Sequence, residues 1–181
     1  MASNIKDFLQ GKRTKHTVGQ VNSYEFETVI NGAVCKENLD NFTMGELVYE
    51  AVDGVVETCV KKASATCKAH DAVLLVTPEV RLSKGEFQEL LSDFYNGKGE
   101  RATCALLKPG FTFETSAFDA TDVSSTPAVG QYATWDDVGG KFKLKATTDD
   151  TEVKLFRVID VTTDVNYSID DEKMVMLSVL R

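Results

Sequence analysis

The chain has 181 residues with 20 basic and 28 acidic side chains, so its formal net charge is -8. Hydrophobic residues make up 43% of it, which is too high a share for intrinsic disorder, and no apolar run approaches the ~20 residues that span a bilayer. The acidic balance argues against a protein that coats nucleic acid, because phosphate binding needs an excess of lysine and arginine. We therefore expect an acidic globular protein with no membrane contact.

The charge is unevenly distributed along the chain. Residues 1–20 carry four basic side chains and one acidic one, a net charge of +3, which leaves -11 for residues 21–181. Such an arm could bind an acidic neighbour, either a protein subunit or nucleic acid, or it could be a solvated terminus. The candidate docking residues in this arm are Lys6, Lys12, Arg13, Lys15 and His16.

The first half of the chain is typical of short strands joined by tight turns. Residues 21–30 alternate between polar and apolar side chains and precede Asn31-Gly32, which favours a two-residue hairpin turn. Residues 47–52 and 55–60 flank Asp53-Gly54, a second turn signal of the same kind. Residues 72–77 form a continuous apolar run that ends at Pro78, as in a strand buried on both faces.

One helix is predicted over residues 83–97. Ser83 and Glu86 fit a capping box, in which each side chain binds a backbone donor of the first turn. Apolar residues then recur at helical spacing, and Asn96-Gly97 can end the helix in a left-handed conformation.

The remainder of the chain is predicted to be β structure. Strands are expected at residues 102–107, 111–115, 129–135, 141–145, 153–161 and 174–180, with a turn at 108–110 and an irregular loop at 117–127. The last strand is apolar on both faces, so it must be covered on both sides by the domain or by a partner. We expect a mainly β protein with one short α-helix, a small β-barrel or β-sandwich with an extended N-terminal arm. The corresponding division is an arm (1–20), a hairpin region (21–82), the helix (83–97) and a β-domain (98–181).

Residues able to support catalysis or bind a metal are sparse. The two histidines, His16 and His70, have no nucleophile at a characteristic spacing, and the four cysteines lack the paired spacing of a zinc site. We expect free thiols in a reducing cytoplasm, although spacing alone leaves a bridge between Cys59 and Cys67 open. Trp135 could be a stacking platform but is more typical of partial core. Three acidic clusters, at 136–137, 149–150 and 170–172, fit turns better than a calcium loop. No catalytic, cofactor-binding or metal-ligating residues are therefore predicted.

A succession of short segments lies within residues 73–181, at 76–80, 93–99, 106–113, 129–132, 139–144 and 174–180; they include Leu106-Leu107-Lys108-Pro109-Gly110-Phe111 and Val129-Gly130-Gln131-Tyr132. In these segments the chain resembles the small head-decoration and minor capsid proteins of tailed bacteriophages. The resemblance implies a non-enzymatic protein that binds the outer capsid lattice, and it identifies no functional residues.

The expected function is thus that of a virion structural protein, assembled in the host cytoplasm, which binds the capsid lattice and stabilises or decorates the head. Its expected partners are the major capsid protein or other virion subunits, and a homo-oligomer is possible; nucleic acid is not an expected partner. A tail, baseplate or other minor virion protein is the main alternative. A single-strand nucleic-acid binder with an OB-like barrel is a weaker one, because it would need a basic groove.

Overall fold

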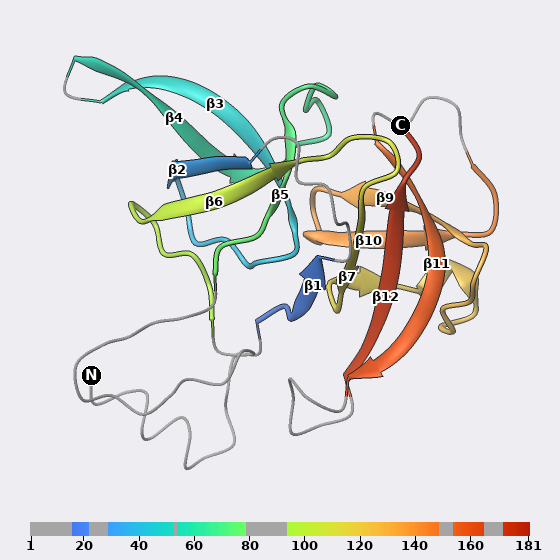
Figure 1. Cartoon of the computed structure of the whole chain (residues 1–181). Coiled ribbons are helices and arrows are strands. Elements are labelled where there is room, and N and C mark those ends of the chain that lie inside the picture. The colour runs from blue at the N-terminus through green and yellow to red at the C-terminus, as the bar shows by residue number, and fades with distance from the viewer. Residues whose placement is uncertain (1–15, 22–28, 53, 79–93, 149–153, 165–171) are drawn as a thin grey trace, which may run out of the picture.

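The computed structural model describes residues 16–21, 29–52, 54–78, 94–148, 154–164 and 172–181. Within them the fold is almost entirely β, and it consists of a closed five-stranded barrel beside a seven-stranded sheet (Figure 1). This confirms the predicted fold class. In the described part of the chain, no helix is long and apolar enough to cross a membrane.

The barrel has the strand order β2-β4-β3-β5-β6 and closes where β6 pairs with β2. Its strands are β2 Val29–Cys35, β3 Met44–Val52, β4 Val55–Lys62, β5 Ala72–Leu75 and β6 Arg101–Leu106. Val52 pairs directly with Val55, which confirms the predicted two-residue hairpin at 53–54. Apolar side chains fill the barrel interior, among them Ala33, Cys35, Leu47, Val60, Val73, Leu75, Ala102 and Cys104. The barrel therefore has a packed core.

The sheet has the strand order β1-β7-β12-β11-β9-β10-β8. Its strands are β1 Gly19–Val21, β7 Thr112–Thr115, β8 Phe118–Asp119, β9 Tyr132–Asp136, β10 Lys141–Lys145, β11 Leu155–Asp164 and β12 Glu172–Val179. β12 lies between β7 and β11, and Met174, Val175, Leu177 and Val179 are buried. The C-terminal strand is thus covered largely within the domain.

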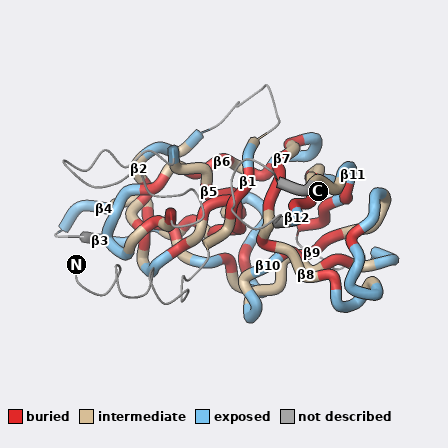
Figure 2. Tube along the Cα trace, turned by 90° about the horizontal axis from the view of Figure 1, so that it is seen from below, coloured by how far each residue is buried: buried red, intermediate tan, exposed pale blue. Residues whose placement is uncertain are grey.

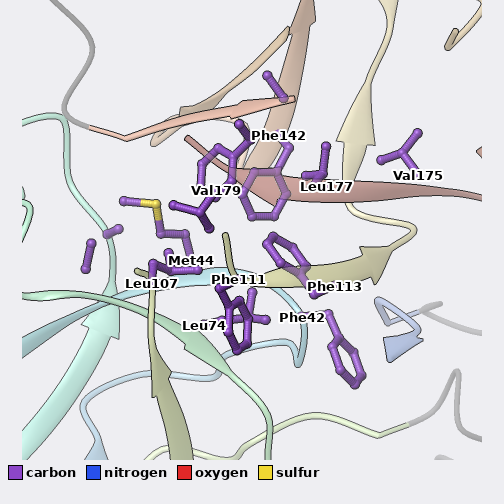
Figure 3. Packing of buried hydrophobic residues seen from close by; sticks show 14 of the residues in the cluster. Phe42, Met44, Leu74, Leu107, Phe111, Phe113, Phe142, Val175, Leu177 and Val179 are labelled. Carbon is purple, nitrogen blue, oxygen red and sulfur yellow. The ribbon is translucent and has the colours of Figure 1, made fainter. Parts of the chain in front are cut away.

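One hydrophobic core joins the barrel to the sheet. Met44 and Leu74 of the barrel pack in the same cluster as Phe113, Phe142 and Leu177 of the sheet (Figure 3). β5 is central to this arrangement because all four of its residues are buried. Val73 and Leu75 belong to the barrel core, whereas Ala72 and Leu74 belong to the shared core. This confirms the prediction of a strand buried on both faces.

The predicted hairpin turn at Asn31-Gly32 is wrong. Both residues lie within β2, which pairs with β6 on either side of them: Asn31 is opposite Thr103 and Ala33 is opposite Ala102. The register shifts between Asn31 and Ala33, and Gly32 has φ = +84°. The Asn-Gly pair therefore forms a β-bulge, which, like a tight turn, requires a residue with positive φ. Most of the strand predicted at 21–30 lies outside the described residues.

The helix predicted at 83–97 is described only over its last four residues, and these are not helical. Asn96 forms a β-bridge with Leu39, and Phe94 is buried. Residues 79–93 lie outside the described part of the chain. Another difference concerns the loop predicted at 117–127, which contains the short strand β8 and a 3-10 turn at Thr121–Val123. The division predicted at residue 98 does not separate the barrel from the sheet. β6 comes after residue 98 in the chain, yet it completes the barrel together with strands that come before residue 98.

Candidate functional site

His16 is the one described member of the candidate docking arm, and it packs against its own chain. Its Nδ1 lies 2.7 Å from Oδ1 of Asp40, and its ring stacks on Tyr95 at a centroid distance of 4.8 Å. Thr17 Oγ1 donates to the other oxygen of Asp40 at 3.4 Å. His16 therefore anchors the end of the arm and is not an exposed docking group. The four basic residues at positions 6, 12, 13 and 15 lie outside the described part of the chain.

A buried polar network lies next to this anchor and was not predicted. Asn41 is fully buried; its Nδ2 donates to the Thr77 carbonyl at 2.7 Å, and its Oδ1 accepts from the Thr77 amide at 3.2 Å. Asn96 Nδ2 donates to the same Oδ1 at 3.0 Å and to the Leu39 carbonyl at 3.2 Å. Because buried amides need partners, these bonds hold together segments more than 30 residues apart in the chain. The network is structural.

The most exposed apolar side chains on the barrel lie on the end of the β3–β4 hairpin. We call residues 48–52 and 55–58 the β3–β4 ribbon; it extends away from the rest of the molecule (Figure 1). Tyr49, Val55 and Val56 are 65%, 64% and 71% exposed. The ribbon is one of the accessible ends of the fold (Figure 2).

The ribbon continues beyond the strands that flank it. The pairing of β3 with β5 ends at Glu46, and that of β4 with β2 involves only Cys59 and Val60. Tyr49 pairs with Thr58, and Ala51 pairs with Val56. By the two-residue period of a strand, these pairs share a face with Leu47 and Val60, which are buried in the barrel. An apolar face therefore continues from the barrel core into solvent.

Ion pairs hold the opposite face of the ribbon to the barrel. Glu50 pairs with Lys36 at 2.5 Å, and Glu57 pairs with Arg101 at 3.2 Å. Arg101 also donates to the Gly32 carbonyl at the β2 bulge, at 2.9 Å. These contacts orient the ribbon and leave its apolar face accessible. Sequence reasoning found the hairpin but not this exposure, because alternation alone does not show where the neighbouring strands end.

All four cysteines are free and buried, so Cys59 and Cys67 are not bonded to each other. Burial raises the pKa of Cys35 to about 11, with Glu100 adding to the effect. Burial also raises the pKa of Cys67 to about 11 and that of Cys104 to about 12. A reactive cysteine requires the opposite shift, because the thiolate is the nucleophile. These thiols behave as small apolar side chains.

The other predicted polar residues have structural contacts. Trp135 donates from Nε1 to the Ala63 carbonyl at 2.9 Å and packs against Phe142, as expected of partial core. His70 is 75% exposed and lies 3.4 Å from Asp71. Asp136 and Asp137 accept backbone bonds from Val138 and Ala65. The described residues contain no group of three or more His, Cys, Asp or Glu side chains that could hold a metal ion. The acidic pair at 149–150 and residues 170–171 are outside the described part.

Lys154 is a buried cation that the sequence did not single out. It is only 7% exposed, and its Nζ donates to the Leu107 carbonyl at 2.7 Å. Desolvation lowers its pKa from 10.5, although the nearby Cys67 opposes the shift. Its bond links the start of β11 to the segment between β6 and β7. Lys154 therefore helps to join the barrel to the sheet.

Comparison with known proteins places the chain among phage-derived sequences. The model of a family described as YonC prophage protein matches residues 12–180. A protein from Bacillus subtilis (strain 168), named as an SPbeta prophage-derived uncharacterized protein YonC, is 34% identical over 173 residues, which cover 91% of each chain. No solved structure matches. These findings support the phage origin that the sequence resemblance implied, while the head-decoration role remains a hypothesis.

Proposed function

The chain belongs to the YonC prophage protein family, and from this premise we propose that it is a non-enzymatic virion structural protein. It binds the capsid lattice of a tailed phage, and it stabilises or decorates the head. It assembles in the host cytoplasm, and its partner is the major capsid protein or another virion subunit.

The exposed apolar face of the β3–β4 ribbon is the observation that carries this proposal. A two-stranded ribbon is at best marginally stable in water by itself, and on this face Tyr49 and Val56 are 65% and 71% exposed. Large apolar side chains grouped at an accessible end are typical of surfaces that another protein covers. In this proposal, the ribbon rests on an apolar surface of a capsid subunit.

Two further features support a binding role. All four cysteines are buried, and burial raises the pKa of Cys35, Cys67 and Cys104, so these three thiols are suited to packing and not to nucleophilic catalysis. Side chains fill the barrel interior, so in this proposal the protein binds its partner through its outer surface. On a particle, a modest contact is repeated in every copy, and avidity compensates for its small area.

The basic arm is a second point of attachment in this proposal. His16 anchors the end of the arm at Asp40 and Tyr95, so Lys6, Lys12, Arg13 and Lys15 precede a fixed point on the barrel. Their net positive charge suits an acidic patch on the lattice.

The test measures how much of the protein is present in purified particles. Tyr49→Thr combined with Val56→Thr keeps strand propensity while removing apolar surface, and we expect occupancy to fall at least ~10-fold, since two such side chains contribute about 1.5 kcal/mol or more each when buried. Val138→Thr, at a position 87% exposed on the β9–β10 turn, is the matched control. Removal of residues 1–15 tests the arm while retaining His16.

Particles that lack the wild-type protein altogether would contradict a virion role. Unchanged occupancy of the double variant would contradict docking through the ribbon. Copy number per particle, measured against the major capsid protein, separates the proposal from its main alternative, because a protein that binds the lattice is present in a fixed ratio to the capsid subunits.

A further inference from the structure

The chain contains two Asn-Gly pairs, and the fold places them in opposite environments. Asn31-Gly32 forms the bulge of β2, where that strand pairs with β6 (Figure 1). Asn31 is exposed, and in the described part of the chain no hydrogen bond joins its side-chain amide to another residue. The other pair is Asn96-Gly97, in which Asn96 is only 2% exposed. The two pairs therefore have the same sequence and differ in their surroundings.

An Asn-Gly pair can react with itself. The backbone nitrogen of the glycine loses its proton to base and attacks Cγ of the asparagine, a new N–C bond forms, and ammonia leaves to give a succinimide ring. Water then adds to either carbonyl of the ring and opens it to aspartate or isoaspartate, so the net reaction consumes water and releases ammonia. Glycine favours the reaction because it has no side chain to shield the attacking nitrogen. The reaction needs only water and base, and asparagine is for this reason a thermolabile residue.

The bulge makes the first pair accessible to this chemistry. Ile30 and Ala33 both pack in the barrel core, although strict alternation would place positions three apart on opposite faces. The register shift between Asn31 and Ala33 accounts for this, and Gly32 has φ = +84°. Ring closure requires the backbone to rotate next to Asn31, and a regular ladder resists such rotation because its hydrogen bonds fix each residue. At the bulge the ladder is interrupted, and water and base reach the exposed amide.

The second pair is protected at both reacting groups. Asn96 Nδ2 donates to two carbonyl oxygens, at 3.0 and 3.2 Å, so the leaving amide is held in place. The attacking nitrogen, that of Gly97, donates to Oε2 of Glu100 at 2.8 Å, and the adjacent carboxylate opposes loss of its proton. Reaction at this pair therefore requires local opening of the fold. We propose that Asn31 is a site of spontaneous deamidation in the folded protein, whereas Asn96 keeps its amide.

The carboxylate that deamidation creates lies on the same face as Arg101. Asn31 is opposite Thr103 of β6, and Arg101 lies two residues from Thr103 on that strand. Diagonal neighbours of this kind are within reach of a long side chain. Arg101 already donates to Glu57 of the β3–β4 ribbon at 3.2 Å and to the Gly32 carbonyl at 2.9 Å. Deamidation therefore adds a second carboxylate beside the ion pair that orients the ribbon.

The test is peptide mapping by mass spectrometry after incubation of the full-length protein at neutral pH and physiological temperature for several weeks. Trypsin, used below neutral pH so that digestion adds no deamidation, releases the two pairs in separate peptides, residues 16–36 and 85–98. We expect the folded protein to convert Asn31 at least ~10-fold faster than Asn96, because Asn96 reacts only from an open state. In concentrated urea, where neither pair has its native surroundings, the two rates should agree within about twofold.

Asn31→Gln is the matched control, since it keeps the amide but lengthens the side chain, and the larger ring closes far more slowly. In this variant the peptide of residues 16–36 should keep its mass. The proposal is overturned if Asn31 keeps its amide in the folded protein while the urea-unfolded chain loses it, because the fold would then protect the bulge. It is also overturned if Asn31 and Asn96 convert at equal rates in the folded protein. A gain of the same mass in peptide 16–36 of the variant would overturn it too, because the reaction would then lie at Asn22.

Discussion

Replacing Phe113 with alanine should destabilise the barrel and the sheet together. Phe113 is completely buried in β7, and its ring centroid lies 6.2, 5.4 and 5.9 Å from those of Phe111, Phe142 and Phe156. Its core cluster also includes Met44 and Leu74 from the barrel. Loss of the ring removes contacts from both parts of the fold at once.

The expected cost is about 4 kcal/mol, because a Phe→Ala change in a core loses the transfer free energy of the ring and leaves a cavity. Two of the three neighbouring rings, Phe142 and Phe156, come from paired strands, so the surroundings can only partly fill the cavity. With a urea slope of about 2.5 kcal/mol/M, the midpoint should fall by about 1.5 M. Val138→Ala, on an exposed turn, should shift it by less than about 0.2 M.

The assay follows urea unfolding by two signals. The single tryptophan, Trp135, reports on the contact between sheet and barrel because it lies in β9 and its Nε1 is bonded to the Ala63 carbonyl. Far-UV circular dichroism reports on all strands. Coincident transitions that shift together are expected for one cooperative unit. Two separate transitions, with only one displaced in the Phe113→Ala variant, would refute a shared core.

Three further predictions concern buried charge, thiols and the bulge. Lys154→Met should raise the free energy of unfolding at pH 7 by about 1 kcal/mol, because burial of an ammonium is unfavourable, and should steepen the loss of stability at alkaline pH. An unchanged urea midpoint would contradict this, because it would show that the contacts of Lys154 offset the cost of burying its charge. The folded-state pKa values of Cys35, Cys67 and Cys104 exceed the ordinary 9.0, so the contribution of these thiols to stability is fully present below pH 9 and is lost as pH rises toward 11 to 12. Urea midpoints measured from pH 7 to 10.5 should therefore decline above pH 9. A flat profile would contradict the burial of the thiols. Gly32→Ala should cost about 1 kcal/mol because φ is +84°, measured by thermal unfolding, and a neutral result would exclude the bulge geometry.

Features that depend on neighbouring residues were predictable from the sequence. The hairpin at 53–54 follows from a turn pair between alternating strands, and Val52 indeed pairs with Val55. The alternation of β10 places Phe142 and Leu144 in the core and the three lysines outside. The apolar composition of residues 72–75 indicated burial on both faces, which β5 shows. In each case the spacing of apolar and polar residues along the chain is enough to predict the feature.

Features that depend on distant strands were not predictable in this way. Asn31-Gly32 satisfies a turn and a bulge equally, and only the pairing of β2 with β6 decides between them. The contact of His16 with Asp40 and Tyr95 joins segments whose proximity no local pattern records. The amide network of Asn41 and Asn96 is likewise a product of the fold.

The sequence by itself determined the fold class, the position of most strands and the separation of a basic arm from an acidic body, because composition and periodicity are properties of the chain alone. Only the tertiary structure decided where a surface suited to binding would lie. The β3–β4 ribbon is exposed because its neighbours β2 and β5 end before it does. Strand ends and registers are set by packing across the whole molecule, which is the physical reason that this surface could not be inferred from the order of residues.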